Sequence, residues 1–240
     1  MQAVLLASGD NTRVSHLYPN LPKVMFPIGN RPFLSYYLDL LFQEGITELI
    51  IVVYYKKEKI IDFINSLPKE RKGKVTIIER KGSYGPVGVL VDIKNQLQEN
   101  FFLFYGDVLF KANLKKIWHN FTSSNKVSSF ITKDQFGMFS SMEIAINTEK
   151  TKIVDFSPSK YTRSEGWMDV GQLNNKSIID LLKNVPPEEE HVNKNIWTQL
   201  IHDNEVTYSI VGPVFDIGTE RNYKLTNDIF EKRGGLKALG

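Results

Sequence analysis

The chain has 240 residues, of which 42% are hydrophobic, and a formal charge of +3. This length fits one large α/β domain or two small ones, with enough apolar residues for a sizeable core. The absence of cysteine excludes disulfides and thiolate metal sites. The small net charge, without a long Lys/Arg block, argues against a nucleic-acid-binding protein. The sequence shows neither a signal peptide nor a transmembrane span, so we expect a cytoplasmic protein that does not contact a membrane.

Strands and helices alternate along the first half of the chain. Short apolar runs predict buried strands at residues 2–7, 48–53, 75–78 and 101–104. Helical spacing of apolar residues predicts helices at 32–42, 56–66 and 88–97. This alternation is typical of βαβ units. It predicts an α/β fold, a Rossmann-like three-layer sandwich with a mostly parallel (mixed) central sheet.

The second half of the chain is less regular. We predict helices over residues 113–121, 174–183, 192–202 and 219–232. We predict strands over residues 127–132, 141–146, 152–156 and 206–211. No linker-like composition and no internal repeat interrupts the chain, so we expect a single domain over residues 1–240 whose second half builds part of the pocket.

The loop after the first strand consists of small and polar residues, from Ser8 to Thr12, followed by Arg13. Small side chains let backbone N–H groups approach an anion closely. Arg13 would add a forked positive charge and Lys23 a compact one. This combination predicts a phosphate site. The alternative from the loop alone is a surface turn with two solvated cations.

Two aspartates follow apolar strands. Asp107 comes after the run 101–104, and Asp216 comes after Val214-Phe215. In open parallel sheets, ligands bind beyond the carboxyl ends of the strands, where these side chains would lie near the phosphate loop. Two carboxylates there predict a Mg²⁺ site, because Mg²⁺ takes oxygen ligands and shares them with substrate phosphates. Alternatively, each aspartate only caps a turn or helix.

The order of these motifs resembles that of the sugar-1-phosphate nucleotidyltransferase family. The family opens with L-A-x-G-x-G-T-R and P-K-x-M-x-P-I, which correspond here to residues 6–13 and 22–28. Further matching segments, in order, are residues 29–34, 83–90, 105–107, 169–171 and 216–223. The likeness covers essentially the whole chain. It is closest to short members that lack a C-terminal β-helix, including mannose- and heptose-1-phosphate guanylyltransferases.

The resemblance implies an enzyme that joins an NTP, with GTP favoured, to a heptose or hexose 1-phosphate. The products would be a nucleotide-diphospho-sugar for polysaccharide biosynthesis and pyrophosphate. No protein nucleophile is needed, so positioning and charge neutralisation would provide the catalysis. The resemblance also implies a nucleotide-binding half over about 1–110 and a sugar-binding half over about 111–240. No nucleic-acid or membrane partner is expected, and a homo-oligomer is compatible with the sequence.

The resemblance assigns roles by motif position. Arg13 would hold the β- and γ-phosphates, and Lys23 would stabilise charge at the α-phosphate. Asp107 and Asp216 would hold Mg²⁺. The nucleotide-binding residues would be Ala7, Ser8, Gly9, Asn11, Thr12, Gly85 and Gly88. The residues that bind the sugar phosphate would be Lys160, Asp169 and Gly171.

The chain departs from the family pattern at several positions. Asn11 replaces the second loop glycine, and Asp169 replaces a neutral asparagine. Residues 157–160 stand in place of a Glu-Lys pair, so the sugar-phosphate lysine is either Lys160, shifted by one residue, or absent. These departures motivate a second hypothesis, a catalytically weakened homologue that binds a nucleotide or nucleotide-sugar as a regulator or partner subunit. A third hypothesis is a glycosyltransferase that uses a metal-bound nucleotide-sugar. Against it, residues 105–107 lack the paired carboxylates of a D-x-D motif.

Overall fold

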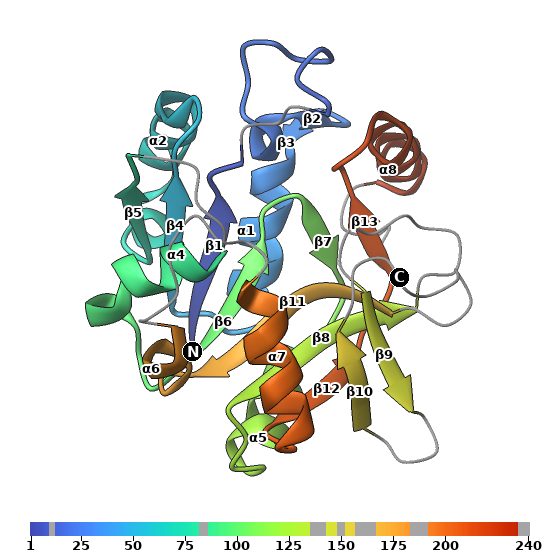
Figure 1. The fold of residues 1–240 in the computed structure, drawn as a ribbon. Helices are drawn as coiled ribbons and strands as arrows, with labels where there is room; N and C mark the ends of the chain where they lie inside the picture. Colours follow the sequence, from blue (N-terminus) through green and yellow to red (C-terminus); the bar gives the residue numbers. More distant parts are fainter. Residues whose placement is uncertain are drawn as a thin grey trace. The chain divides into compact units, whose positions relative to one another are not determined.

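The computed structural model describes residues 1–9, 13–81, 86–134, 143–147, 152–156, 167–182 and 192–234 (Figure 1). The chain forms two compact units that alternate along the sequence. Unit 1 comprises Met1–Ser83, Phe104–Asn113 and Gly212–Gly240. Unit 2 comprises Tyr84–Leu103 and Leu114–Val211. Within the described ranges, no helix is long and apolar enough to cross a membrane.

Unit 1 contains parallel strands in the order β1-β4-β5. They are β1 (Gln2–Ala7), β4 (Glu48–Val53) and β5 (Val75–Glu79), and Figure 1 shows them side by side. The first two strands are buried along almost their whole length, as expected for parallel strands that are covered on both faces. The side chains of β5, at the end of this strand order, are partly exposed.

The helices of unit 1 differ in how much of their surface they bury. The helix α1 (Phe33–Gln43) is buried on most sides, whereas α2 (Lys57–Asn65) buries only Ile60 and Ile64. The C-terminal helix α8 (Glu220–Arg233) begins after Thr219, whose side chain caps it. The remaining elements of this unit are η1 (Lys23–Met25), β2 (Pro27–Ile28), β3 (Arg31–Pro32), α3 (Lys69–Lys72), β7 (Val108–Phe110) and β13 (Val214–Asp216).

Unit 2 is built on strands of mixed direction. Its strand order is β10-β9-β11-β6, and β8 pairs with both β11 and β12. The pairing of β11 with β8 and with β9 is antiparallel, whereas β12 runs parallel to β8. The strands are β6 (Asn100–Tyr105), which ends in unit 1, β8 (Ser128–Asp134), β9 (Glu143–Asn147), β10 (Lys152–Phe156), β11 (Trp167–Asn175) and β12 (Val206–Ile210). The helices are α4 (Pro86–Asp92), η2 (Lys94–Gln96), α5 (Leu114–Thr122), α6 (Ile178–Leu182) and α7 (Val192–His202).

Most predicted elements are confirmed within two residues at each end, but two helices are shorter than predicted. The helix predicted over 88–97 ends at Asp92 and is followed by the short η2. The helix predicted over 174–183 is wrong at its start, because Trp167–Asn175 is strand β11 and α6 begins only at Ile178. Polar side chains hide this strand from a search for apolar runs: Asn174 is fully buried and accepts a hydrogen bond from Ser128 Oγ at 2.7 Å.

Candidate active site

A pocket of about 70 Å³ lies at the carboxyl end of β1 in unit 1. Its lining combines the end of β1, the beginning of the predicted phosphate loop and two charged side chains. The residues are Leu6, Ala7, Gly9, Lys23, Val24 and Asp107. The predicted nucleotide-binding residue Ser8 is nearly buried. Two further predicted residues of this loop, Asn11 and Thr12, lie outside the described residues.

Gly106 brings Asp107 against β1. The Gly106 N–H donates to Leu6 O at 2.9 Å. A Cβ at this position would lie 2.6 Å from Leu6 O and 2.8 Å from Val24 Cγ1, so any side chain would push the chain away from β1. The glycine therefore allows the close approach that places Asp107 in the pocket.

Lys23 forms an ion pair with Asp107. The distance from Lys23 Nζ to Asp107 Oδ2 is 2.9 Å, and the two side chains are 14% and 28% exposed. Lys23 is the first residue of η1, and the side chain of the next residue, Val24, lies where a side chain at Gly106 would clash with it. The predicted phosphate-binding lysine and one predicted metal ligand thus share the pocket.

Asp216 comes to the same place from the C-terminal part of unit 1. The antiparallel pairing of β13 with β7 sets Asp216 opposite Val108, and Ile217 N–H donates to Asp107 O at 2.9 Å. The Asp216 carboxylate accepts hydrogen bonds from Gly218 N–H and from Asn222 Nδ2. Its side chain is nearly buried, and this burial, together with the charge of Asp107, raises the pKa of Asp216 to about 6.

Gly218 marks the point where three of the predicted residues converge. A Cβ built on this glycine would lie 2.9 Å from Asp216 Oδ1, 3.4 Å from Asp107 Oδ2 and 3.6 Å from Arg13 Nη2. Unit 1 therefore brings together both predicted cations and both predicted metal ligands. The Arg13 residue is exposed, so its guanidinium is accessible to a ligand.

The two carboxylates fit a Mg²⁺ ion. Both carboxylates offer the oxygen ligands that Mg²⁺ prefers. The negative charge of the buried Asp216 is stabilised only slightly by Lys23, whose attraction is the smallest of the contributions to the pKa of Asp216. The residues that the structure describes contain no group of three His, Cys, Asp or Glu side chains that could hold a metal. A two-carboxylate site suits a metal that completes its coordination with substrate phosphates and water.

The other predicted residues belong to unit 2 or lie outside the described residues. Gly88 is buried in α4, and Gly171 is buried in β11. The backbone of Asp169 pairs with that of Thr132. Gly85 and Lys160 are outside the described residues. The predicted sugar-phosphate contacts thus stay predictions.

Sequence reasoning missed Asn222, which donates to Asp216 Oδ2 at 3.0 Å and is itself buried. The sequence at the start of α8 contains a pattern that could have indicated Asn222. Thr219 is the N-cap of α8 and accepts a hydrogen bond from Asn222 N–H at 3.2 Å. The side chain at the third helical position points back toward the cap, and here that direction leads to Asp216.

The profile of the nucleotidyl transferase family matches residues 2–231. The chain therefore belongs to this family. One similar protein is the bifunctional protein GlmU of Methanococcus maripaludis, which is 24% identical over 246 residues, covering 98% of this chain and 57% of that protein. Another is the UTP–glucose-1-phosphate uridylyltransferase AglF of Haloferax volcanii, 35% identical over 114 residues, covering 48% of this chain and 46% of that protein. The chain spans about half the length of the curated relatives it matches.

A solved structure has the same fold. The crystal structure of a putative glucose-1-phosphate thymidylyltransferase from Bacillus anthracis superposes with a TM-score of 0.82 at 16% identity. The match covers 96% of this chain and 95% of that one. It confirms the predicted Rossmann-like α/β fold with a mixed central sheet. The family match confirms the resemblance to sugar-1-phosphate nucleotidyltransferases.

Proposed function

We propose that the protein joins an NTP to a sugar 1-phosphate and releases pyrophosphate. The observation that supports this most is the convergence of Arg13, Lys23, Asp107 and Asp216 beside the pocket at the end of β1. Two cations and two carboxylates in one place are what a reaction between phosphate groups requires, since it depends on charge neutralisation. The name of one relative, the UTP–glucose-1-phosphate uridylyltransferase AglF, agrees with this reaction class.

In the proposed reaction, an oxygen of the sugar 1-phosphate attacks the α-phosphorus of the NTP. The new bond joins that oxygen to the α-phosphorus, and the bond from the α-phosphorus to the bridging oxygen of the β-phosphate breaks. Arg13 would hold the departing β- and γ-phosphates, and Lys23 would stabilise charge at the α-phosphate. Asp107 and Asp216 would hold Mg²⁺, which neutralises phosphate charge when bound.

We further propose GTP as the nucleotide and a heptose or hexose 1-phosphate as the acceptor. The resemblance of the sequence motifs to those of short guanylyltransferases supports this choice, whereas the name of AglF specifies UTP, so the base needs a direct test. Residues 7–9, together with Gly85 and Gly88, would contact the nucleotide. Lys160, Asp169 and Gly171 would contact the sugar phosphate. We expect the reaction in the cytoplasm, as a step that supplies nucleotide-sugars for polysaccharide biosynthesis.

The decisive experiment is a pyrophosphate-release assay over a panel of substrates. GTP, UTP, ATP and dTTP would each be paired with mannose, glucose and heptose 1-phosphates, with Mg²⁺ and with EDTA. Pyrophosphate together with a nucleotide-diphospho-sugar supports the proposal. Nucleotide binding without pyrophosphate from any pair supports the weakened homologue. Transfer from a ready-made nucleotide-sugar, without pyrophosphate, supports the glycosyltransferase.

A substitution at Asn11 distinguishes the hypothesis of an active enzyme from that of a weakened homologue. A backbone phosphate cradle works when no side chain obstructs the amide groups, and Asn11 adds a side chain to this loop. Asparagine adopts left-handed backbone conformations more readily than most residues. We therefore expect Asn11→Gly to change NTP affinity by less than about tenfold, or ~1.4 kcal/mol. A gain of several orders of magnitude in calorimetric NTP binding would identify the present chain as a disabled relative.

A further inference from the structure

Three segments that carry the charged residues of the candidate site meet at a cluster of three aromatic rings in unit 1. The rings are those of Tyr18, Phe26 and Tyr223. We propose that a hydrogen-bonded relay through the hydroxyls of Tyr18 and Tyr223 positions Arg13 and Lys23 for nucleotidyl transfer. The two tyrosines are positioning residues, and this inference rests on the proposed function.

The geometry of the relay fixes its direction. Tyr223 Oη donates to Pro27 O at 2.8 Å, so its oxygen is left to accept from Tyr18 Oη, also at 2.8 Å. Burial raises the pKa of the Tyr223 hydroxyl, which is therefore protonated and able to donate at neutral pH. The relay joins the segment after Arg13 to α8 and to the segment after Lys23.

The rings hold the hydroxyls in place. The ring of Phe26 lies 4.9 Å from that of Tyr18 and 5.9 Å from that of Tyr223, measured between centroids. The planes of Phe26 and Tyr223 are nearly perpendicular, at 89°, which is a favourable edge-to-face arrangement. Phe26 is fully buried and lies three residues after Lys23. The packing thus links Lys23 to both tyrosines.

The segment from Arg13 to Tyr18 lies along the start of α8 and contacts it at three successive points. Arg13 Nη2 lies beside Gly218, His16 Nε2 is 3.0 Å from Glu220 Oε2, and Tyr18 bonds to Tyr223 as described above. Glu220 and Tyr223 are three positions apart, so they lie on the same face of the helix. Residues 13–18 therefore dock along residues 218–223 in the same order. Tyr18 holds the end of this segment that is farthest from Arg13, through its hydrogen bond to Tyr223.

The segment after Lys23 is tied to the same helix. Gly29 N–H donates to Asn227 Oδ1 at 2.7 Å, one turn after Tyr223, which itself donates to Pro27 O. A shift of Tyr223 would therefore move both cation-bearing segments relative to Asp216. Misplacement of reacting groups by about 1 Å can lower a rate by ~10²-fold. The hydroxyl relay therefore sets the rate of transfer by fixing these positions.

The experiment uses variants that remove hydroxyls and keep the rings, namely Tyr18→Phe, Tyr223→Phe and the double variant. We expect each single variant to lower kcat by about tenfold and to weaken pyrophosphate inhibition by a similar factor, because Arg13 would hold the leaving phosphates. Tyr223→Phe already removes both hydrogen bonds, so the double variant should equal it. An additive double variant would show that the hydroxyls do not form one chain.

Tyr36→Phe is the matched control. Tyr36 Oη donates to Ile28 O at 3.0 Å, so this variant also removes one hydroxyl bond to a carbonyl of the β2–β3 hairpin, but from α1. We expect a loss of thermal stability similar to that of Tyr18→Phe, with kcat within twofold of the parent. A fall in kcat equal to that of Tyr223→Phe would reduce the relay to ordinary structural support. Unchanged kcat and pyrophosphate inhibition in Tyr18→Phe would overturn the proposal.

Calorimetric binding of pyrophosphate separates this proposal from the proposed function, because it needs no turnover. If the parent protein binds pyrophosphate, and Tyr18→Phe weakens that binding while Tyr36→Phe does not, the relay holds even when no substrate pair reacts. If the parent turns over and Tyr18→Phe binds pyrophosphate as the parent does, only the relay fails. A parent protein that neither turns over nor binds pyrophosphate overturns both proposals.

Discussion

Two of the clusters of oppositely charged side chains in unit 1 differ in charge balance. One is centred on Asp39, in α1, and the other on Asp107 and Asp216. Both place carboxylates among cations in a partly buried setting. In the first cluster the carboxylate is neutralised by its protein partners, whereas in the second the carboxylates can still be stabilised by a bound cation.

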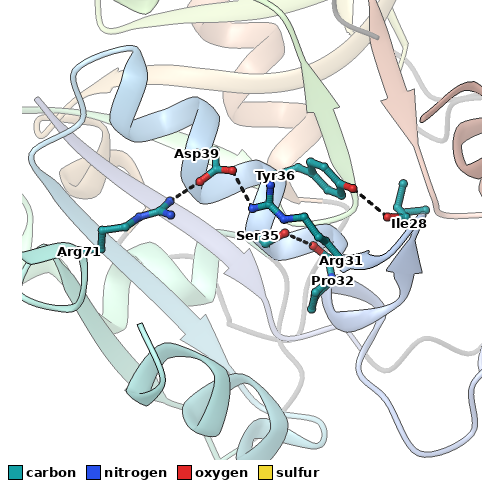
Figure 2. Close-up of polar contacts among 7 residues, drawn as sticks. All are labelled: Ile28, Arg31, Pro32, Ser35, Tyr36, Asp39 and Arg71. Carbon is teal, nitrogen blue, oxygen red and sulfur yellow. Dashed lines mark hydrogen bonds and ion pairs between the residues drawn. The ribbon is translucent and has the colours of Figure 1, made fainter. Parts of the chain in front are cut away.

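Asp39 is fully compensated by two arginines. Its Oδ2 is 2.7 Å from Arg31 Nη2, and its Oδ1 is 2.6 Å from Arg71 Nη2. Figure 2 shows the carboxylate between the two guanidinium groups, which come from β3 and α3. Arg31 also lies over the ring of Tyr36, at 4.7 Å. Each oxygen has its own cation, so this cluster is complete without a ligand.

The carboxylates of the candidate site are less well compensated. Asp107 has Lys23 as its ion-pair partner, but Asp216 accepts its hydrogen bonds from neutral N–H groups of Gly218 and Asn222. The pKa of Asp216 rises because burial and Asp107 outweigh these donors and Lys23. An uncompensated, buried carboxylate beside a pocket is typical of a functional site. The Asp39 cluster is satisfied within the fold, whereas we propose that the Asp107–Asp216 cluster binds Mg²⁺ and substrate phosphates.

The largest effect is expected from neutralising the candidate metal ligands. Asp107→Asn and Asp216→Asn should each abolish measurable Mg²⁺-dependent turnover, because an amide is a much weaker Mg²⁺ ligand than a carboxylate. Turnover would be measured by pyrophosphate release against Mg²⁺ concentration. Asp39→Asn is the control and should leave Mg²⁺ dependence unchanged. If both site variants keep the Mg²⁺ dependence of the parent, the two aspartates are only structural caps.

Loss of the lysine should have the next largest effect. We expect Lys23→Ala to lower turnover by ~10²-fold or more, the scale of removing one preorganised electrostatic donor. The chain should stay folded, since Lys23 contributes no apolar side chain to the core, and circular dichroism would verify this. Turnover equal to that of the parent would show that Lys23 acts only as the partner of Asp107.

Sequence patterns predicted the fold well and the site in part. The strand–helix alternation gave the parallel part of the sheet, because buried strands such as β1 and β4 are unbroken apolar runs. Strand β11 was missed because its buried face carries Gln172 and Asn174. The cluster of charged residues was predicted because each residue follows a strand or a loop with a recognisable signature.

The contacts that hold the site together could not be predicted from the sequence. Tyr223 reaches Pro27 and Tyr18 across sequence separations of 196 and 205 residues, and these partners are specified by the orientation of α8 rather than by a local pattern. Gly106 illustrates the same limit. Its need for close approach depends on where Leu6 and Val24 lie in space. Local signatures can indicate which residues act, but not which neighbours position them.

The raised pKa of Asp216 predicts that this group lowers the free energy of unfolding at neutral pH relative to acidic pH. Its folded-state pKa of about 6 is above the ordinary value of 3.8, so the folded protein binds this proton more tightly than the unfolded chain does. The resulting stabilisation is fully present below about pH 4 and is lost as the pH rises to about 6. A shift of about two pKa units corresponds to at most about 3 kcal/mol.

Asp216→Asn should remove this pH dependence. Above pH 6 the variant should therefore be more stable than the parent, by up to about 3 kcal/mol, although it lacks turnover. Urea unfolding between pH 4 and pH 8 would measure the difference between the two proteins. Mg²⁺ should stabilise the parent at pH 7 and leave the variant unaffected. A parent that is more stable than the variant above pH 6 would contradict the assignment of Asp216 as an uncompensated carboxylate.

The smallest effect is expected at the compensated cluster. Arg71→Ala removes one of the two cations of Asp39 and a contact with the ring of Phe42, at 5.4 Å. Arg71 is 32% exposed and Asp39 keeps Arg31, so we expect a loss of about 0.5–1 kcal/mol in the free energy of unfolding. Turnover should be unchanged, because Asp39 and its two arginines are not among the residues that line the pocket. Urea unfolding and the pyrophosphate assay on one preparation test both statements. A tenfold fall in kcat at unchanged stability would place the Asp39 cluster in the active machinery and remove the contrast between the two clusters.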